Sequence, residues 1–147
     1  MASPSFILRP ATNADFVFMR DTKFEGLEPY VRALWGWDRV EQEQKARDEF
    51  DSANRWIVVC DGLDAGYIHI EHDTDVVTLA GIYLAPSMRR RRLGTAIIQR
   101  VIEQARATGK PVVLRVLKPN PARRLYERLG FQIVGETPER YFMLRQP

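Results

Sequence analysis

Residues 76–117 carry the pattern that most restricts the fold. An apolar stretch at 76–84 comes first, and a nearly uninterrupted apolar run at 112–117 comes last. Between them, apolar residues recur at helical spacing at Ile97, Ile98, Val101, Ile102 and Ala105. Gly109 and Pro111 end that helix as a C′ residue and a following stop. Because a strand that is apolar on both faces belongs in the interior of a sheet, this order predicts a βαβ unit at the centre of an α/β domain.

The first half of the chain predicts a short strand, two helices and an antiparallel meander. Residues 6–9 are expected to form the first strand, and Thr12 or Asn13 can cap the helix that follows. Gly26 and Pro29 are expected to separate this helix from a second one over residues 30–50, which Gly36 can interrupt. The strands expected in the meander are 55–60, 65–71 and 76–84.

The segment after the βαβ unit predicts one more helix and a final strand pair. Asn120 and Pro121 supply an N-cap and a proline at the first position of a helix over residues 122–129. Residues 131–134 and 141–144 are the last two expected strands. The complete order is β-α-α-β-β-β-α-β-α-β-β, which predicts an α/β fold with a mixed, mostly antiparallel central sheet flanked by helices.

Size and composition indicate a single domain. The chain has 147 residues, 45% hydrophobic and 28% charged, and no linker divides it, so we expect one domain over residues 1–147. The N-terminus lacks a secretory signal, and no apolar run approaches the roughly 18 residues of a membrane span. We therefore expect a cytoplasmic protein without a membrane partner. The single cysteine, Cys60, excludes a disulfide framework and is expected to be an inert thiol in a buried strand.

Positive charge is concentrated in the second half. Residues 86–128 contain twelve Lys and Arg against two acids and so carry +10, whereas the whole chain carries +3 and the remainder therefore −7. This segregation suggests a polyanionic ligand in the second half. The arginine run 89–92 by itself could indicate nucleic-acid binding, but no aromatic platform or DNA-reading motif accompanies it. We therefore expect no nucleic-acid partner; many of the arginines can simply cover solvated helix faces.

The turn between strand 76–84 and the following helix is suited to hold an anion. Gly94 stands at the start of that helix, whose first backbone N–H groups lack partners within the helix and whose dipole places positive charge there. A glycine lets a phosphate approach the backbone closely, and the neighbouring arginines offer forked donors to phosphate oxygens. These features predict a ligand that bears phosphate groups, without identifying it.

Two motifs together resemble the GCN5-related N-acetyltransferase (GNAT) family. The family's Arg/Gln-x-x-Gly-x-Gly/Ala signature is matched by Arg91-Arg92-Leu93-Gly94-Thr95-Ala96, which follows a strand as it does in the family. Residues 120–131 look like the family's Asn-x-x-Ala-x-x-Leu-Tyr-x-x-x-Gly-Phe stretch. The order of the predicted elements is also the family's order, so the resemblance covers nearly the whole chain.

The resemblance implies acetyl-CoA as the acetyl donor, with no metal. The residues implied to bind the cofactor come from the strand, the turn, the helix start and the second motif: Ile82, Tyr83, Leu84, Arg89, Arg91, Arg92, Leu93, Gly94, Thr95, Ala96, Asn120 and Tyr126. In the family, the tyrosine that matches Tyr126 protonates the departing CoA thiolate, so Tyr126 is the expected general acid. Taken alone, Asn120 can be only an N-cap, and Tyr126 can be a core aromatic that packs on Phe131.

A general base is harder to assign. Many relatives carry a glutamate on the fourth strand, but residues 78–83 contain no carboxylate. Glu71, at the end of the preceding strand, is the candidate base, and strand alternation places His69 on the same face. Both can instead be solvent-facing strand residues. Base action through water and an amine that arrives neutral are the alternatives.

In this family the acceptor is selected by the region between the first and second strands. Here that region contains Tyr30, Trp35 and Trp37, and residues 38–51 carry six acids against three bases. With Tyr141 as a further candidate wall residue, these features suggest an aromatic and acidic site that favours a cationic amine. The two tryptophans can also simply belong to the core.

With the resemblance, these features predict an enzyme: an N-acetyltransferase that moves an acetyl group to a primary amine, most readily of a small molecule, by direct attack in a ternary complex. One alternative is a protein acetyltransferase acting on lysine or N-terminal amines. Another, of a different class, is a non-catalytic acyl-CoA-binding regulatory module. A homodimer formed through an edge strand is compatible with a sheet of this kind.

Overall fold

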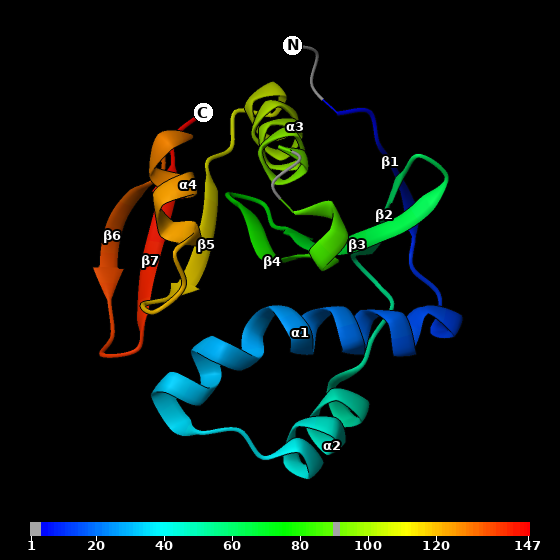
Figure 1. Ribbon diagram of the computed structural model, residues 1–147. Helices are drawn as coiled ribbons and strands as arrows, with labels where there is room; N and C mark the ends of the chain where they lie inside the picture. The colour runs from blue at the N-terminus through cyan, green and yellow to red at the C-terminus, as the bar shows by residue number, and fades with distance from the viewer. Residues whose placement is uncertain (1–3, 90–91) are drawn as a thin grey trace.

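The computed structural model describes residues 4–89 and 92–147, which form a seven-stranded mixed sheet with helices on both faces (Figure 1). The strands are β1 (Ile7–Pro10), β2 (Arg55–Cys60), β3 (Leu63–His72), β4 (Val77–Leu84), β5 (Val112–Leu117), β6 (Gln132–Glu136) and β7 (Arg140–Arg145). The α-helices are α1 (Phe16–Trp35), α2 (Arg39–Glu49), α3 (Leu93–Ala107) and α4 (Ala122–Arg128), with short 3-10 turns at Asn13–Asp15 and Pro86–Met88. The predicted fold class and order of elements are confirmed.

The strand order across the sheet is β1-β2-β3-β4-β5-β7-β6. Within it, β4 and β5 run parallel, joined by the α3 crossover, and the other neighbours are antiparallel. The parallel register is short, because it pairs only Val77 with Val112 and Thr78 with Val113. The two strands therefore separate after their first residues, in the middle of the sheet.

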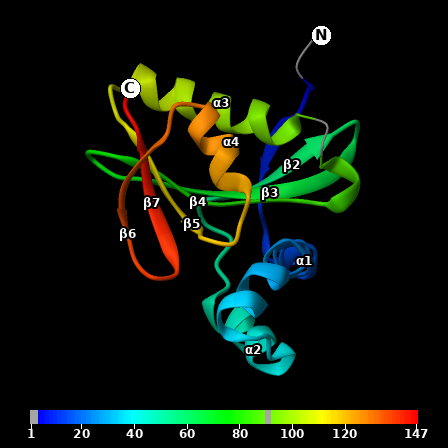
Figure 2. The same ribbon diagram turned by 60° about the vertical axis from the view of Figure 1, so that its left-hand side comes forward.

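The two faces of the sheet are covered unequally. Helices α3 and α4 pack on one face, and α1 and α2 lie on the other (Figures 1 and 2). The α3 face holds the larger core, in which Ile97, Ile98 and Met143 are almost completely buried. The α1 face has a smaller core around Met19, Ile57 and Tyr67. Fewer side chains fill the α1 face, which leaves room there for a cavity.

The boundary between the first two helices differs from the sequence prediction. Helix α1 continues through Gly26 and Pro29 and ends at Gly36, which adopts φ 79° and donates its N–H to the Arg32 carbonyl at 3.0 Å. A glycine costs a helix roughly 1 kcal/mol relative to alanine, and a proline removes one hydrogen bond. The burial of apolar α1 side chains against the sheet outweighs both, so only the left-handed residue stops the helix.

Two further sequence expectations can be compared with the fold. Cys60 is buried in β2, as predicted, and its Sγ lies 3.4 Å from the Ser5 carbonyl. In the described part of the chain, no helix combines the length and the apolar character needed to cross a bilayer.

Two glycines offer a matched test of the packing. A Cβ on Gly66 would lie 2.1 Å from the Tyr83 carbonyl oxygen and 2.9 Å from the Leu84 Cα, both backbone atoms of β4. A Cβ on Gly26 would meet only side-chain atoms, the closest at 3.6 Å. We therefore expect Gly66→Ala to lower the free energy of unfolding by about 2 kcal/mol or more, and Gly26→Ala to leave it unchanged or raise it by up to about 1 kcal/mol. Urea denaturation of both variants measures this, and equal effects would contradict the strand register.

Candidate active site

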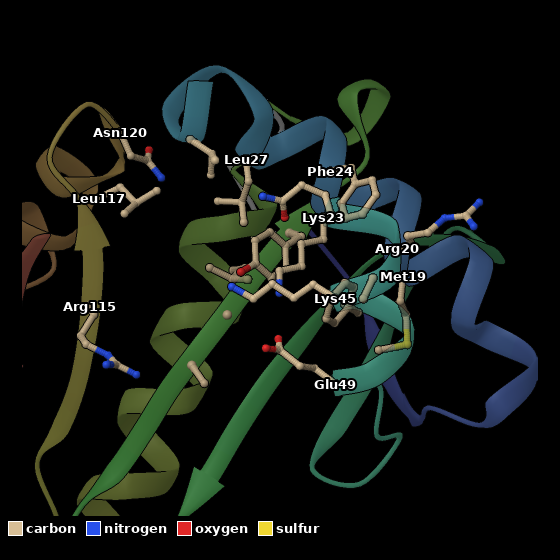
Figure 3. A pocket seen from close by; sticks show the side chains of 18 of the residues that line it. Met19, Arg20, Lys23, Phe24, Leu27, Lys45, Glu49, Arg115, Leu117 and Asn120 are labelled. Atoms are coloured by element: carbon tan, nitrogen blue, oxygen red, sulfur yellow. The ribbon is translucent and has the colours of Figure 1, made fainter. Parts of the chain in front are cut away.

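A cavity of about 560 Å³ lies where β4 and β5 separate, on the side of α1 and α2 (Figure 3). Most of its walls come from one side of α1, one side of α2, residues 79–83 of β4 and residues 114–117 of β5, and single residues of β2, β3, α4 and β7 complete them. Beyond Thr78 the edge of β4 that faces β5 has no strand partner within the described residues. Backbone N–H and C=O groups in such a position need another partner, and a ligand inserted between the strands can supply it.

Tyr126 projects from α4 to this cavity, although α4 packs on the opposite face of the sheet. The side chain is buried, and its ring meets Phe131 edge-on at a centroid distance of 5.9 Å. Tyr126 is therefore both a packed aromatic and a cavity residue, so the two interpretations of the sequence are compatible. Burial raises the pKa of the phenol to about 12, with a smaller contribution from Tyr83. The hydroxyl consequently keeps its proton throughout the physiological range.

Tyr83 and Tyr67 extend the aromatic wall away from Tyr126. Their rings lie 5.1 Å apart, and both residues line the cavity. Burial raises the pKa of Tyr83 to about 12 and raises that of Tyr67 as well, while Arg55 opposes the rise in both. Arg55 lines the cavity beside Tyr67, because it lies on β2 two residues before Ile57, which pairs with Tyr67 of β3.

Asn120 lies at the rim of the cavity, at the end of β5 (Figure 3). Its Oδ1 accepts a hydrogen bond from the Ala122 backbone N–H at 2.9 Å, which anchors the start of α4. The predicted positions are wrong by one residue: Pro121 is the N-cap and Ala122 the first helical residue, so Asn120 precedes the cap and still binds the first N–H of the helix. The side-chain nitrogen makes no hydrogen bond within the described part of the chain and is left to donate to a ligand.

The predicted anion-binding turn leads into α3. Arg92 adopts a left-handed conformation at φ 58° and precedes Leu93, the first helical residue, which is buried. A Cβ on Gly94 would meet only the Leu84 side chain, at 3.7 Å, so the helix start is open to a close ligand. Thr95 and Ala96 are half-buried. Arg91, also expected to bind the cofactor, lies outside the described residues.

Arg89 is engaged by other parts of the protein. Its guanidinium pairs with the Glu25 carboxylate of α1, and its Nε donates to the Leu84 carbonyl at 3.2 Å. The residue therefore ties the end of β4 to α1. Its expected role in cofactor binding stays a prediction.

Glu71 does not line the cavity. Its carboxylate lies 2.5 Å from Nε2 of His69 and accepts a hydrogen bond from the Asn54 side chain at 3.0 Å. Their contact confirms that His69 and Glu71 share a face of β3. The assignment of Glu71 as the base stays a prediction, and its placement does not add support.

Two of the four residues expected to bind the acceptor lie at the cavity, and two do not. Trp35 and Trp37 line the cavity, whereas Tyr30 and Tyr141 do not. Trp35 is 53% exposed, so it is not a core residue, and the Arg140 guanidinium lies over its ring at 5.4 Å. Trp37 meets Phe24 edge-on at 5.3 Å. Tyr141 is instead partly buried against the α3-side core, flanked by Lys118 and Arg123.

The expected acidic wall is not the surface that faces the cavity. Helix α2 turns Gln42, Lys45, Ala46 and Glu49 inward, at the i, i+3, i+4 and i+7 spacing of one helical face. The other acids of residues 38–51 do not line the cavity; Asp38 caps α2 by accepting from the Glu41 N–H, and Glu43 pairs with Arg39. Net charge over a segment therefore misled the prediction, because the helix separates its charges between two faces.

Lys23 is a cavity residue that the sequence analysis did not single out. It follows Phe16 and Met19 and precedes Leu27 on the cavity face of α1, and its Nζ lies 5.9 Å from the centre of the Tyr83 ring. Burial lowers the pKa of Lys23; Glu49 opposes this shift, and Arg55 and Lys45 add to it. A lysine on an otherwise apolar helical face was the available signal.

The chain is similar in sequence to one protein family and in fold to several solved structures. Residues 20–131 match the model of the acetyltransferase (GNAT) family. The PaiA N-acetyltransferase of Thermoplasma acidophilum, solved in complex with coenzyme A, is similar with a TM-score of 0.79 and 14% identity, over 97% of this chain and 99% of that one. An acetyltransferase from Thermus thermophilus is similar with a TM-score of 0.75 and 22% identity over the full length of both chains. At these identities the two structures bear on the fold alone.

One curated relative is similar over part of its sequence. The L-methionine sulfoximine/L-methionine sulfone acetyltransferase of Pseudomonas aeruginosa is 35% identical over 60 residues. The match covers 40% of this chain and spans about a third of that protein's length, 35%.

Lys23 generates a prediction about stability. Replacing a half-buried cation by an apolar side chain of similar length removes a desolvation cost, so we expect Lys23→Met to stabilise the free protein at pH 7 by about 1 kcal/mol. Because the pKa of Lys23 is lowered in the folded state, the unfolded state binds more protons, and the wild type gains stability as pH rises through that lowered pKa. The difference in the free energy of unfolding between Lys23→Met and the wild type should therefore become smaller towards pH 10.

Urea unfolding of both proteins from pH 7 to pH 10 measures the difference. Arg47→Met, which removes an exposed cation of α2 that does not line the cavity, is the matched control and should show no such narrowing. If the difference in the free energy of unfolding between Lys23→Met and the wild type did not change with pH, the conclusion that the Lys23 ammonium is desolvated would be wrong.

Proposed function

Because the chain belongs to the acetyltransferase (GNAT) family, we propose that it transfers the acetyl group of acetyl-CoA to the primary amine of a small molecule. One observation carries the proposal: the gap between β4 and β5 brings Tyr126, Asn120 and an unpaired strand edge to one cavity. The start of α3 follows directly from the same strand β4 by way of the Pro86–Met88 turn. Ligand binding and chemistry are thereby assigned to adjoining parts of one site.

The residues around the gap fit acetyl-CoA. The open N-terminus of α3 at Gly94 suits the diphosphate, since a helix start offers free N–H groups and positive potential to an anion. The strand edge of β4 beyond Thr78 and the Asn120 amide suit an arm that carries amide groups. When bound, acetyl-CoA supplies an acetyl group activated as a thioester.

In the proposed reaction, Tyr126 is the general acid. Its buried hydroxyl lines the cavity and, with a pKa of about 12, holds a proton that it can donate to the departing sulfur. Backbone N–H groups on the free edge of β4 are placed to polarise the thioester carbonyl. Holding the amine against that carbonyl within one cavity contributes the remaining acceleration, because it converts an encounter into attack within a complex.

A small-molecule acceptor is favoured over a protein. The match to the Pseudomonas aeruginosa acetyltransferase, whose name gives small amino acid derivatives as substrates, supports this choice. The cavity also lies beneath α1 and α2, which cover it with aromatic and charged side chains. For the base, the proposal retains the alternatives of water-mediated transfer and an amine that arrives neutral, beside Glu71.

Cofactor binding is expected to stabilise the protein measurably. CoA at about 100 times its Kd should raise the free energy of unfolding by about 2.7 kcal/mol. Gly94→Glu should abolish this rise, because a carboxylate at the start of α3 repels the phosphates while leaving the fold intact, since the space around Gly94 is open. Gln104→Glu, which adds the same charge at an exposed position in α3 away from that start, is the control. Thermal or urea unfolding with and without CoA measures this rise. If CoA did not raise the stability of the wild type, acetyl-CoA would be refuted as the donor.

The reaction itself is tested by thiol release from acetyl-CoA. With small amines as acceptors, Tyr126→Phe is expected to lower kcat by about 10²-fold or more while leaving the Kd for CoA nearly unchanged, because phenylalanine preserves the contact with Phe131. Since the pKa of Tyr126 is about 12, ionisation of this residue should cause no loss of kcat up to about pH 10. Turnover with peptides but not with small amines would favour a protein acceptor, and CoA binding without any turnover would favour a regulatory module.

A further inference from the structure

The cavity is lined by an excess of positive charge. Its six cationic residues are Arg20, Lys23, Lys45, Arg55, Arg115 and Arg140. Among the described residues that line it, Glu49 is the one acid. The other acids of α1 and α2 do not line the cavity, so the excess of positive charge is a property of the cavity and not of the two helices as a whole.

Some of these cations are occupied elsewhere. Arg20 pairs with Asp21 at 3.0 Å and points away from the cavity (Figure 3). Arg140 stacks on Trp35. Arg115 comes from β5, on the wall opposite α2 (Figure 3). The remaining three, Lys23, Lys45 and Arg55, line the cavity together with Glu49, and Lys45, Arg55 and Glu49 each act electrostatically on Lys23.

We call Lys23, Lys45 and Arg55 the cationic cluster. No ion pair joins any of them to a carboxylate in the described part of the chain, and one donor of Arg55 is used by the Ala53 carbonyl at 2.9 Å. Glu49 alone cannot balance three cations, and Lys23 is half-buried. A partly buried charge without a paired counter-ion is unfavourable, so an anion bound among the three cations would stabilise the ammonium of Lys23.

The phosphates of the cofactor do not account for the cluster. The proposed diphosphate site is the start of α3, which packs on the opposite face of the sheet from α1 and α2 (Figures 1 and 2). The cluster instead lies beside Tyr67 and Tyr83: Lys23 Nζ is 5.9 Å from the centre of the Tyr83 ring, and Arg55 is two residues before Ile57, which pairs with Tyr67. Tyr126 lines the same cavity. An anion on the cluster would therefore be part of the acceptor.

Resting on the function proposed above, we infer that the acceptor is an amine that also carries a carboxylate, and that the cationic cluster binds this carboxylate. Arg55 offers the forked donors that match a carboxylate, and Lys23 and Lys45 add charge from α1 and α2. The amine end of the same molecule then points towards Tyr126. This inference replaces the cationic amine that the acidity of residues 38–51 suggested.

A matched acceptor panel tests the inference. Each free amino acid, including glycine, β-alanine and the common L-amino acids, is compared in the thiol-release assay with its carboxamide and its decarboxylated amine. For the preferred side chain, we expect kcat/KM for the carboxylate form to exceed that of the other two by about tenfold or more. A preference for the amide, the decarboxylated amine or a polyamine would overturn the inference while leaving the acetyltransferase proposal intact.

Single substitutions test which residues bind the acceptor carboxylate. Arg55→Gln and Lys45→Gln should each raise KM for the carboxylate acceptor by about tenfold and should reduce the preference for the carboxylate over its amide. Arg47→Gln, an exposed residue of α2 that does not line the cavity, is the matched control and should change neither. Weaker CoA binding in Arg55→Gln with an unchanged acceptor KM would assign the cluster to the cofactor and overturn the inference.

A binding measurement separates the two proposals. Trp35 and Trp37 line the cavity, so their fluorescence can follow titration with an N-acetyl amino acid and with the corresponding N-acetyl amide in the presence of CoA. If the N-acetyl amino acid binds more tightly than its amide, and Arg55→Gln removes this preference, the cationic cluster binds the carboxylate even if no acceptor is turned over. Equal binding of the two compounds would overturn it.

Discussion

The structure depends on the short parallel register between β4 and β5. Two residue pairs, Val77 with Val112 and Thr78 with Val113, hold the two halves of the sheet together before the strands diverge. Each strand remains firmly paired on its other side, β4 with β3 and β5 with β7, so the opening does not unravel the sheet. The free strand edges, the route of Tyr126 into the cavity and the position of Asn120 all follow from this divergence.

The two faces of the sheet have different tasks. The α3 face is filled by a continuous apolar core, which holds the start of α3 and the ring of Tyr126 in place. The α1 face is packed less completely, so aromatic and cationic side chains of α1 and α2 surround space rather than core. One sheet thereby carries a closely packed side and a more open side, to which the proposed function assigns the donor phosphates and the acceptor respectively.

The cationic cluster places Lys23, Lys45 and Arg55 together at a cost in desolvation and mutual repulsion. A protein can retain such an arrangement where a ligand supplies the missing charge, because the unfavourable interactions in the free state become favourable in the complex. The carboxylate of Glu49 offsets part of the positive charge of the cluster but not all of it. In the proposed mechanism, the charge beside Tyr67 and Tyr83 selects the acceptor and Tyr126 transfers the proton.

The sequence by itself determined the local elements and the family. Apolar periodicity in residues 76–117 predicted the βαβ unit, and the turn at Gly94 with the Asn120–Phe131 stretch predicted the donor side, because these signals are short-range. Only the tertiary structure decided where α1 ends, since packing outweighed the local preferences of Gly26 and Pro29. It also decided the charge of the cavity. Segment composition counts all the acids of residues 38–51, whereas helix α2 turns only one face, with Lys45 and Glu49, towards the strand gap.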